Sequence, residues 1–164
     1  LRNSSAASDV YKRQMYNLVK RQAEVEILPM AKSENIGVIS YSPLGGGLLT
    51  GKYNIDNTSN KNSLGRLHDN SKYKKRYGQN WMYNAAIALQ KLASELNYDP
   101  IALAVAWVSH NDAITAPIIS ARNLKQLKPS LDSIKISLDE DAYKLISNLS
   151  PTPPPATDRL EEVQ

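Results

Sequence analysis

The feature that most constrains the fold is a helix, a buried strand and a glycine-rich loop that follow one another without a gap. Residues 24–35, EVEILPMAKSEN, place Leu28 and Ala31 on one helical face. Gly37 is expected to lie just past the end of this helix, because glycine adopts positive φ there. Residues 37–42, GVISYS, then read as a buried strand. A helix joined by a short glycine link to an apolar strand is typical of the parallel sheet of an α/β protein.

Downstream, the sequence predicts further helices and another strand. Residues 82–96 keep apolar side chains at helical spacing. Asp99 and Pro100 mark the start of the next helix, because aspartate caps free N–H groups and proline suits the first turn. Residues 113–120, AITAPIIS, read as a buried strand.

The C-terminal part carries two more expected helices and a tail. The first begins near Asn123, and Pro129 is expected to bend or end it, because proline lacks the backbone N–H. The second is capped by Ser137 or Asp139. Residues 151–164 are proline-rich without a pattern and are expected to form a flexible tail. The first of these helices is expected to turn its leucines inward: Leu124, Leu127 and Leu131.

The strand count is small for a complete α/β fold. Only about three strands are expected: one near residues 15–19, where MYNLV reads as a strand end or a strand-to-helix loop, and those at 37–42 and 113–120. Three parallel strands cannot close a barrel, and an open sheet leaves unpaired edges. The polar residues 52–80 exceed the ~12–15 residues of an ordinary loop, which marks a functional or disordered segment. The chain therefore reads as the back part of a larger α/β protein.

Composition excludes several classes of site and partner. The 164 residues contain no cysteine and only two histidines, so we expect neither a disulfide framework nor a metal site. No apolar run reaches the ~18 residues of a membrane-spanning helix, and the N-terminal residues lack the apolar core of a signal peptide. The formal charge of +4 is too small to indicate nucleic-acid binding. The expectation is a cytoplasmic protein with no nucleic-acid or membrane partner.

The first fourteen residues differ in character from those that follow. Residues 4–14, SSAASDVYKRQ, match what a common transposon-type sequencing adapter encodes in frame. We interpret residues 1–14 as a non-native, adapter-derived segment and set them aside when predicting the fold. Native sequence is then expected to begin at Met15.

The stretch YSPLGGGLLTGKY, residues 41–53, nearly fits the phosphate-binding loop G-x-x-x-x-G-K-[ST]. That motif needs a hydroxyl residue for Mg²⁺ after the lysine, where this chain has Tyr53. It also needs a helix N-terminus facing the phosphates, but NIDNTSN at 54–60 disfavours a helix. A nucleoside-triphosphate site is therefore rejected. A tight turn alone explains one or two glycines, but less well the combination of strand, Ser-Pro and three glycines.

Residues 15–53, from MYNLV to GLLTGKY, resemble the aldo-keto reductases, in particular the branch of bacterial aldo/keto reductases and potassium-channel β subunits. Residues 117–131, PIISARNLKQLKPSL, resemble that family's second cofactor segment, and Gly65-Arg66 lies in a polar loop like the family's. The resemblance covers residues 15–150. It implies a (β/α)8 TIM barrel with NADP(H) at the C-terminal strand ends, of which this chain would supply about strands 6–8.

The resemblance assigns the first cofactor segment to the glycine loop. Tyr41 falls where the family sets an aromatic ring against the nicotinamide, and Lys52 offers a positive charge to the pyrophosphate or the 2′-phosphate. Arg66 is expected to help clasp the diphosphate. Small residues let backbone N–H groups approach anionic oxygens. The pyrophosphate-contacting turn is assigned to Ser42, Pro43, Leu44, Gly45 and Gly46.

The second segment is assigned to the adenosine end of the cofactor. Ser120, Arg122 and Gln126 match family positions near the 2′-phosphate and adenine. A guanidinium at the mouth of a helix N-terminus suits a phosphate monoester, which favours NADP over NAD. Ser130 is expected to hydrogen-bond the adenine, whereas Pro129 cannot replace the glutamate that the family often has there.

The family's catalytic Asp, Tyr, Lys and His lie on the front half of the barrel and have no counterpart here. No catalytic residue is therefore assigned, and the fragment is expected to be inactive alone. Gln14 is left unassigned, because it abuts Met15 and matches the adapter's last codon. The intact parent is expected to reduce aldehydes or ketones by hydride transfer from NADP(H). A non-catalytic, NADP-binding regulatory subunit of the channel-β type and a barrel remnant without a ligand are the alternatives.

Overall fold

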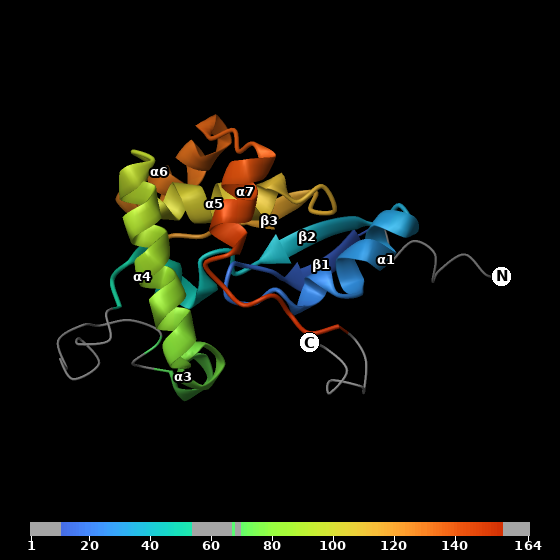
Figure 1. Cartoon of the computed structure of the whole chain (residues 1–164), viewed down its shortest axis with the longest axis horizontal. Helices are drawn as coiled ribbons and strands as arrows, with labels where there is room; N and C mark the ends of the chain where they lie inside the picture. Colours follow the sequence, from blue (N-terminus) through green and yellow to red (C-terminus); the bar gives the residue numbers. More distant parts are fainter. Residues whose placement is uncertain (1–10, 54–66, 68–69, 156–164) are drawn as a thin grey trace.

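The computed structural model describes residues 11–53, 67 and 70–155, which form an α/β arrangement (Figure 1). A parallel sheet of three strands has the order β1-β2-β3. The helices and strands follow one another along the chain as β1 (Tyr11–Met15), the 3₁₀ helix η1 (Gln22–Glu24), α1 (Ile27–Ser33), β2 (Gly37–Tyr41), the 3₁₀ helix η2 (Gly45–Thr50), α3 (Ser71–Tyr77), α4 (Asn80–Glu95), α5 (Pro100–His110), β3 (Ala116–Ile118), α6 (Leu124–Asp132), the 3₁₀ helix η4 (Ser133–Lys135) and α7 (Glu140–Ser147).

The first strand ends where the sequence predicted a strand end or a strand-to-helix loop. It spans Tyr11–Met15, so Met15 is its last residue and residues 16–19 follow it. Residues 16–19 leave the sheet because Asn17 and Lys20 exchange two backbone hydrogen bonds, of 3.2 and 2.9 Å, which turn the chain. Residues 11–14, which the adapter interpretation set aside, thus pair with β2 from Tyr11↔Gly37 to Gln14↔Ser40.

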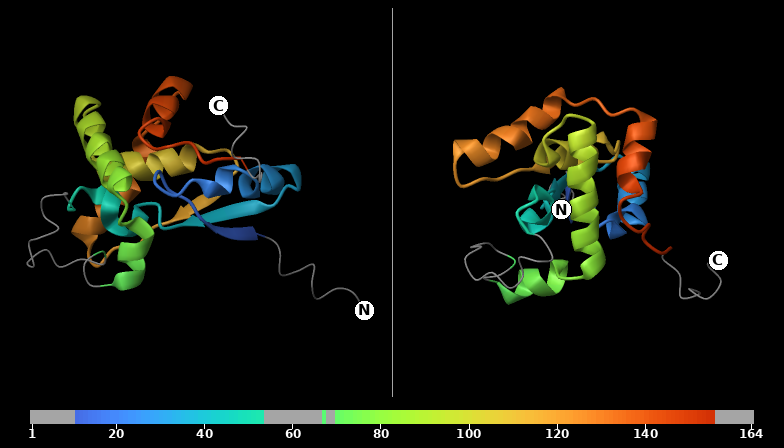
Figure 2. Two further views of the ribbon diagram at one scale, coloured as in Figure 1. Left: turned by 60° about the horizontal axis from the view of Figure 1, so that its bottom comes forward. Right: turned by 60° about the vertical axis from the view of Figure 1, so that its left-hand side comes forward.

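One face of the sheet is packed and the other is more open. Along β2, Val38 and Ser40 are buried, whereas Ile39 and Tyr41 on the opposite face are half-buried. This alternation follows the two-residue period of a strand. Figure 2 shows α1 and α5 on the same side of the sheet. Within the described ranges, no helix is long and apolar enough to cross a membrane.

Three helix starts agree with the sequence, because each depends on a short polar side chain next to the helix. Asp99 accepts from the N–H groups of Ile101 and Ala102 at the start of α5. Asn123 accepts from Gln126 N in α6, and Asp139 caps α7, which decides between it and Ser137. The start signals are therefore confirmed.

Other expectations are corrected. Asn35, with φ of 53°, supplies the left-handed residue after α1, because the helix ends at Ser33 and Gly37 already begins β2. Pro129 does not end α6, which continues to Asp132. The strand expected over 113–120 to be buried shortens to Ala116–Ile118, and its residues are half-buried or exposed because it lies at the sheet edge.

The leucines of α6 do not all point inward. Leu124 is 82% exposed and Leu131 is 50% exposed, whereas Leu127 is half-buried. Ser130 faces inward instead, with 3% of its surface exposed. The prediction that these leucines face inward is therefore wrong for Leu124 and Leu131, because α6 turns Ser130 toward the interior.

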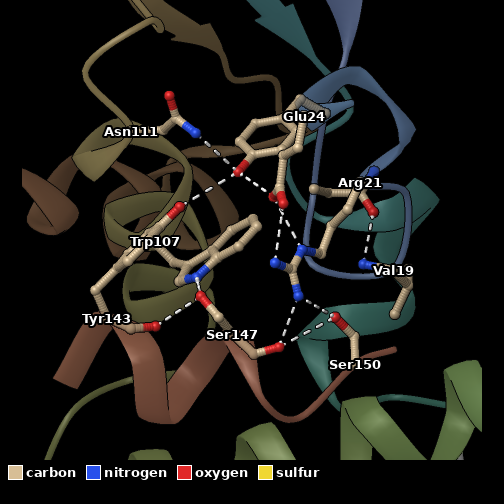
Figure 3. A network of polar contacts seen from close by, with 10 residues as sticks. Val19, Arg21, Glu24, Trp107, Asn111, Tyr143, Ser147 and Ser150 are labelled. Atoms are coloured by element: carbon tan, nitrogen blue, oxygen red, sulfur yellow. Dashed lines mark hydrogen bonds and ion pairs between the residues drawn. The ribbon is translucent and has the colours of Figure 1, made fainter. Parts of the chain in front are cut away.

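A polar network joins the end of β1 to α5 and α7 (Figure 3). The Tyr16 hydroxyl donates to Glu24 at 2.7 Å, and Glu24 pairs with Arg21 at 2.9 Å. Arg21 also donates to the Ser147 carbonyl at 2.8 Å. Trp107 stacks on the Tyr16 ring, with centroids 5.1 Å apart. Burial, and then the charge of Glu24, raise the pKa of Tyr16, so its hydroxyl stays protonated and donates. The network fixes the segment that follows β1.

Candidate cofactor site

The three strands end at one edge of the sheet. Because the strands are parallel and in register, Met15, Tyr41 and Ile118 lie side by side in adjacent strands. The segments that follow them, beginning with Tyr16, Ser42 and Ile119, therefore all leave from this edge. In open α/β sheets and barrels, ligands bind outside the carboxyl ends of the strands. Both predicted cofactor segments start here.

The turn after β2 has an unusual backbone. Ser42 has a φ of 59°, and Gly45, Gly46 and Gly47 have φ of 57°, 66° and 95°. Leu44, between them, has φ −96°. Three consecutive glycines in the left-handed region then curl the chain back on itself at the end of β2. The glycines are required, because residues with a Cβ rarely adopt these angles.

Hydrogen bonds hold the turn in this shape. Gly45 N donates to the Ser42 carbonyl at 3.0 Å, and Gly47 N donates to the Leu44 carbonyl at 2.9 Å. The Thr50 hydroxyl donates to the Gly47 carbonyl at 2.8 Å. The turn is thus closed by its own backbone and by a side chain at its far end.

Aromatic side chains of α3 pack on the turn. A Cβ added to Gly46 would lie 2.7 Å from Cδ1 of Tyr73, and one added to Gly45 would lie 3.6 Å from Cε1 of Tyr77. Tyr77 is fully buried, and its hydroxyl donates to Met15 Sδ at 3.3 Å. Burial raises the pKa of Tyr77, so it carries no charge near the turn at neutral pH.

Lys52 folds back over the glycines. A Cβ on Gly47 would lie 3.4 Å from Lys52 Nζ, so glycine leaves the space that the ammonium occupies. The same Nζ lies 4.9 Å from the centroid of the Tyr53 ring, which favours this position through a cation–π contact. The structure therefore places Lys52 against the turn that the sequence assigned to pyrophosphate. A cation beside a glycine turn, whose backbone carries no side chains that would keep a ligand away, fits a diphosphate.

Tyr41 ends β2 on the half-buried face of the sheet. The Arg13 guanidinium lies 5.8 Å from the centroid of its ring. The Tyr41 carbonyl accepts from Tyr16 N at 3.4 Å, which joins Tyr41 to the start of the segment after β1. A flat ring at this edge suits stacking against another planar group.

The second predicted segment is exposed. Ser120 and Arg122 are exposed, and Arg122 N donates to the Gln126 side-chain oxygen at 3.2 Å. Arg122 and Gln126 thus meet at the N-terminus of α6. Ser130, one helical turn after Gln126, is buried in α6 with 3% exposure. Arg66 lies outside the described residues.

Sequence reasoning missed the residues that support the turn. Asn17 is fully buried and its Nδ2 donates to the Ser42 carbonyl at 2.9 Å. Tyr73 and Tyr77 approach from a helix more than twenty-five residues downstream of the turn. Only Asn17 carried a local signal, because asparagine between apolar residues is unusual in a buried segment.

The chain belongs to the aldo/keto reductase family, whose model matches residues 9–151. This confirms the resemblance. The uncharacterized oxidoreductase YrpG of Bacillus subtilis is 33% identical over 141 residues, which are 84% of this chain and 39% of that protein. Mouse aflatoxin B1 aldehyde reductase member 2 is 32% identical over 130 residues, covering 71% of this chain and 35% of that protein.

A solved structure gives the same result. The chain superposes on a glycerol dehydrogenase of Gluconobacter oxydans with a TM-score of 0.67 and 30% sequence identity, over 84% of this chain and 41% of that one. The chain therefore spans about two fifths of the length of such relatives. Its three-stranded parallel sheet is consistent with an incomplete barrel.

Proposed function

We propose that residues 15–150 are the cofactor-holding portion, about strands 6–8, of an NADP(H)-dependent reductase of aldehydes or ketones. The observation that carries the proposal is the turn after β2, in which glycines of positive φ meet the Lys52 ammonium at the carboxyl edge of the sheet. Membership of the family and relatives described as an oxidoreductase and an aldehyde reductase support it. The intact protein is proposed to act in the cytoplasm on a small-molecule carbonyl substrate.

Each residue has a role that its position supports. The Tyr41 ring stacks on the nicotinamide and orients one face of it. Bound nicotinamide supplies the hydride that reduces a carbonyl carbon. The turn from Ser42 to Gly46 and Lys52 hold the pyrophosphate, and Arg122 holds the 2′-phosphate. Charge-assisted contacts of this kind are the strong ones.

The test is titration of the 164-residue chain with NADPH, followed by cofactor fluorescence. Lys52→Ala is expected to weaken binding about tenfold, the effect of losing ~1.4 kcal/mol of a charge-assisted contact. Lys91→Ala removes an exposed lysine of α4 and is the matched control. Equal affinities of these two variants, or no binding by the unaltered chain, would refute the proposal.

The channel-β type of regulatory subunit shares the same cofactor turn, so binding alone does not separate it from an enzyme. The 164-residue chain is expected to bind NADPH without oxidising it in the presence of an aromatic aldehyde. Turnover of that aldehyde by the longer parent protein favours the reductase. Tight binding with negligible turnover by the parent favours the regulatory subunit.

A further inference from the structure

Asn17 uses both ends of its side-chain amide. Its Nδ2 donates to the Ser42 carbonyl at 2.9 Å, across 25 residues of sequence, and its Oδ1 accepts from Val19 N at 3.1 Å. The residue is fully buried. A buried amide bonded at both ends has one available orientation, because turning it would leave donor and acceptor without partners.

The carbonyl that Asn17 holds belongs to a strained residue. Ser42 has a φ of 59°, a conformation that costs a non-glycine residue ~1–2 kcal/mol. The same carbonyl accepts from Gly45 N at 3.0 Å, which closes the turn. Such strain persists only where the surroundings over-determine the conformation. Asn17 supplies that restraint from outside the turn.

Asn17 is itself firmly placed. It exchanges two backbone hydrogen bonds with Lys20, and Tyr16 before it belongs to the polar network of Figure 3, with a hydroxyl bonded to Glu24. The core therefore holds the segment after β1 in place, and Asn17 in that segment holds the turn after β2.

We infer that Asn17 is a positioning residue for the cofactor turn: it holds Ser42 left-handed and so sets the affinity of the glycine turn for the diphosphate of a dinucleotide. The identity of the ligand rests on the proposed function, whereas the contact by which Asn17 holds Ser42 does not. Without the Asn17 amide, Ser42 relaxes to negative φ, and the bond from Gly45 N to the Ser42 carbonyl that closes the turn is lost.

A double-mutant cycle tests this, using Asn17→Ala, Ser42→Gly and the two together in the 164-residue chain. Asn17→Ala is expected to weaken NADPH binding about tenfold, as for the loss of a ~1.4 kcal/mol restraint. In the Ser42→Gly background the same change is expected to weaken binding less than about threefold, because glycine adopts positive φ without strain. A purely structural role of Asn17 predicts equal losses in both backgrounds, and that result would overturn the inference.

Two further variants make the test decisive. Ser147→Ala removes a hydroxyl that accepts from Trp107 Nε1 and bonds no residue of the segment after β1 or of the turn, so it is expected to lower the melting temperature without changing NADPH affinity. Asn17→Asp keeps the acceptor for Val19 N but cannot donate when ionised, so it serves if Asn17→Ala fails to fold. Hydrogen exchange at the Gly45 and Gly47 amides is expected to speed up at least tenfold in Asn17→Asp and to be unchanged in Ser147→Ala. Unchanged exchange in Asn17→Asp refutes the inference, even where NADPH does not bind and the proposed function fails.

Discussion

The two segments assigned to the cofactor differ in how the protein holds them. The turn after β2 is closed by its own hydrogen bonds and supported by Asn17 and by the Tyr73 and Tyr77 rings. The segment from Ser120 to Gln126 is exposed, and its described contacts are short-range, such as the 3.2 Å bond between Arg122 N and Gln126. One segment is fixed by distant parts of the chain, and the other by its neighbours.

This difference shows which contacts the chain itself supplies. Next to the second segment, α6 and η4 present an apolar row to solvent, with Leu124 82%, Leu131 50% and Ile134 87% exposed. Large apolar side chains are usually covered in a finished domain. The chain spans about two fifths of the length of its relatives. We therefore expect the first segment to be ordered in this chain and the second to depend on residues beyond it.

The largest expected effect is on the first segment. Gly46→Ala places a methyl group at φ 66° and 2.7 Å from Tyr73. We expect a loss of about 2–4 kcal/mol of stability, from left-handed strain and overpacking together. Thermal unfolding measures it, with Asn84→Ala on the exposed face of α4 as control. A loss no larger than that of the control would show that the turn is loose and would remove the contrast between the segments.

Arg122→Ala is expected to act on binding alone. Its side chain is exposed, so the melting temperature should stay within the equivalent of ~0.5 kcal/mol. Affinity for NADPH should fall about tenfold, and affinity for NADH should not change, because only the former has a 2′-phosphate. Fluorescence titrations with both cofactors measure this. An equal loss of affinity for both cofactors would refute the assignment of Arg122 to the 2′-phosphate.

Leu124→Ser tests the exposed row. Because Leu124 is 82% exposed, stability should change by less than ~0.5 kcal/mol. An inward-facing leucine would cost ~2–5 kcal/mol on truncation. Urea unfolding of the variant and of Leu127→Ser, at the half-buried position, distinguishes the two cases. A large loss for Leu124→Ser means that the row is covered in solution.

The smallest effect is expected from Asp132 at the end of α6. Lys128 and Lys135, each 2.6 Å away, hold the pKa of Asp132 below its ordinary value. A lowered folded-state pKa gives stability that is present above the ordinary pKa and is lost as pH falls through the lowered one. Asp132→Asn should therefore lower the melting temperature slightly at neutral pH and leave it unchanged in acid, which flattens its decline below about pH 4. An unchanged pH profile would mean that the ion pairs do not form in solution.

Local signals in the sequence were enough for some features and not for others. Asp99 and Asn123 identified helix starts because the cap and its partners are adjacent in the chain. The apolar run 37–42 identified the central strand. Neither Asn17 nor Tyr73 was recognised, because their contacts with the turn join residues 25 or more positions apart. Periodicity found the stripe on α6, but it does not say whether another element covers that face.

The candidate site also combines features that the sequence predicted with features that it did not. The sequence placed Lys52 and the glycine turn at one strand end, and the structure brings them together because Gly47 leaves room for the ammonium. It grouped Ser130 with Arg122, but the helical turn directs Ser130 into the interior. Which nucleotide atoms these residues contact is a prediction for the titrations.

The stacking of Trp107 has an optical consequence. Its indole is fully buried between the rings of Tyr16 and Tyr143, at 5.1 and 5.6 Å, and its Nε1 donates to Ser147 at 2.9 Å. Trp81, the second tryptophan, is only half-buried on α4. The two indoles should therefore emit at different wavelengths, and the bluer signal reports on the residue next to Asn17. With Trp81→Phe, the remaining emission comes from Trp107, and it reports without a label on the packing around Tyr16 in the segment after β1.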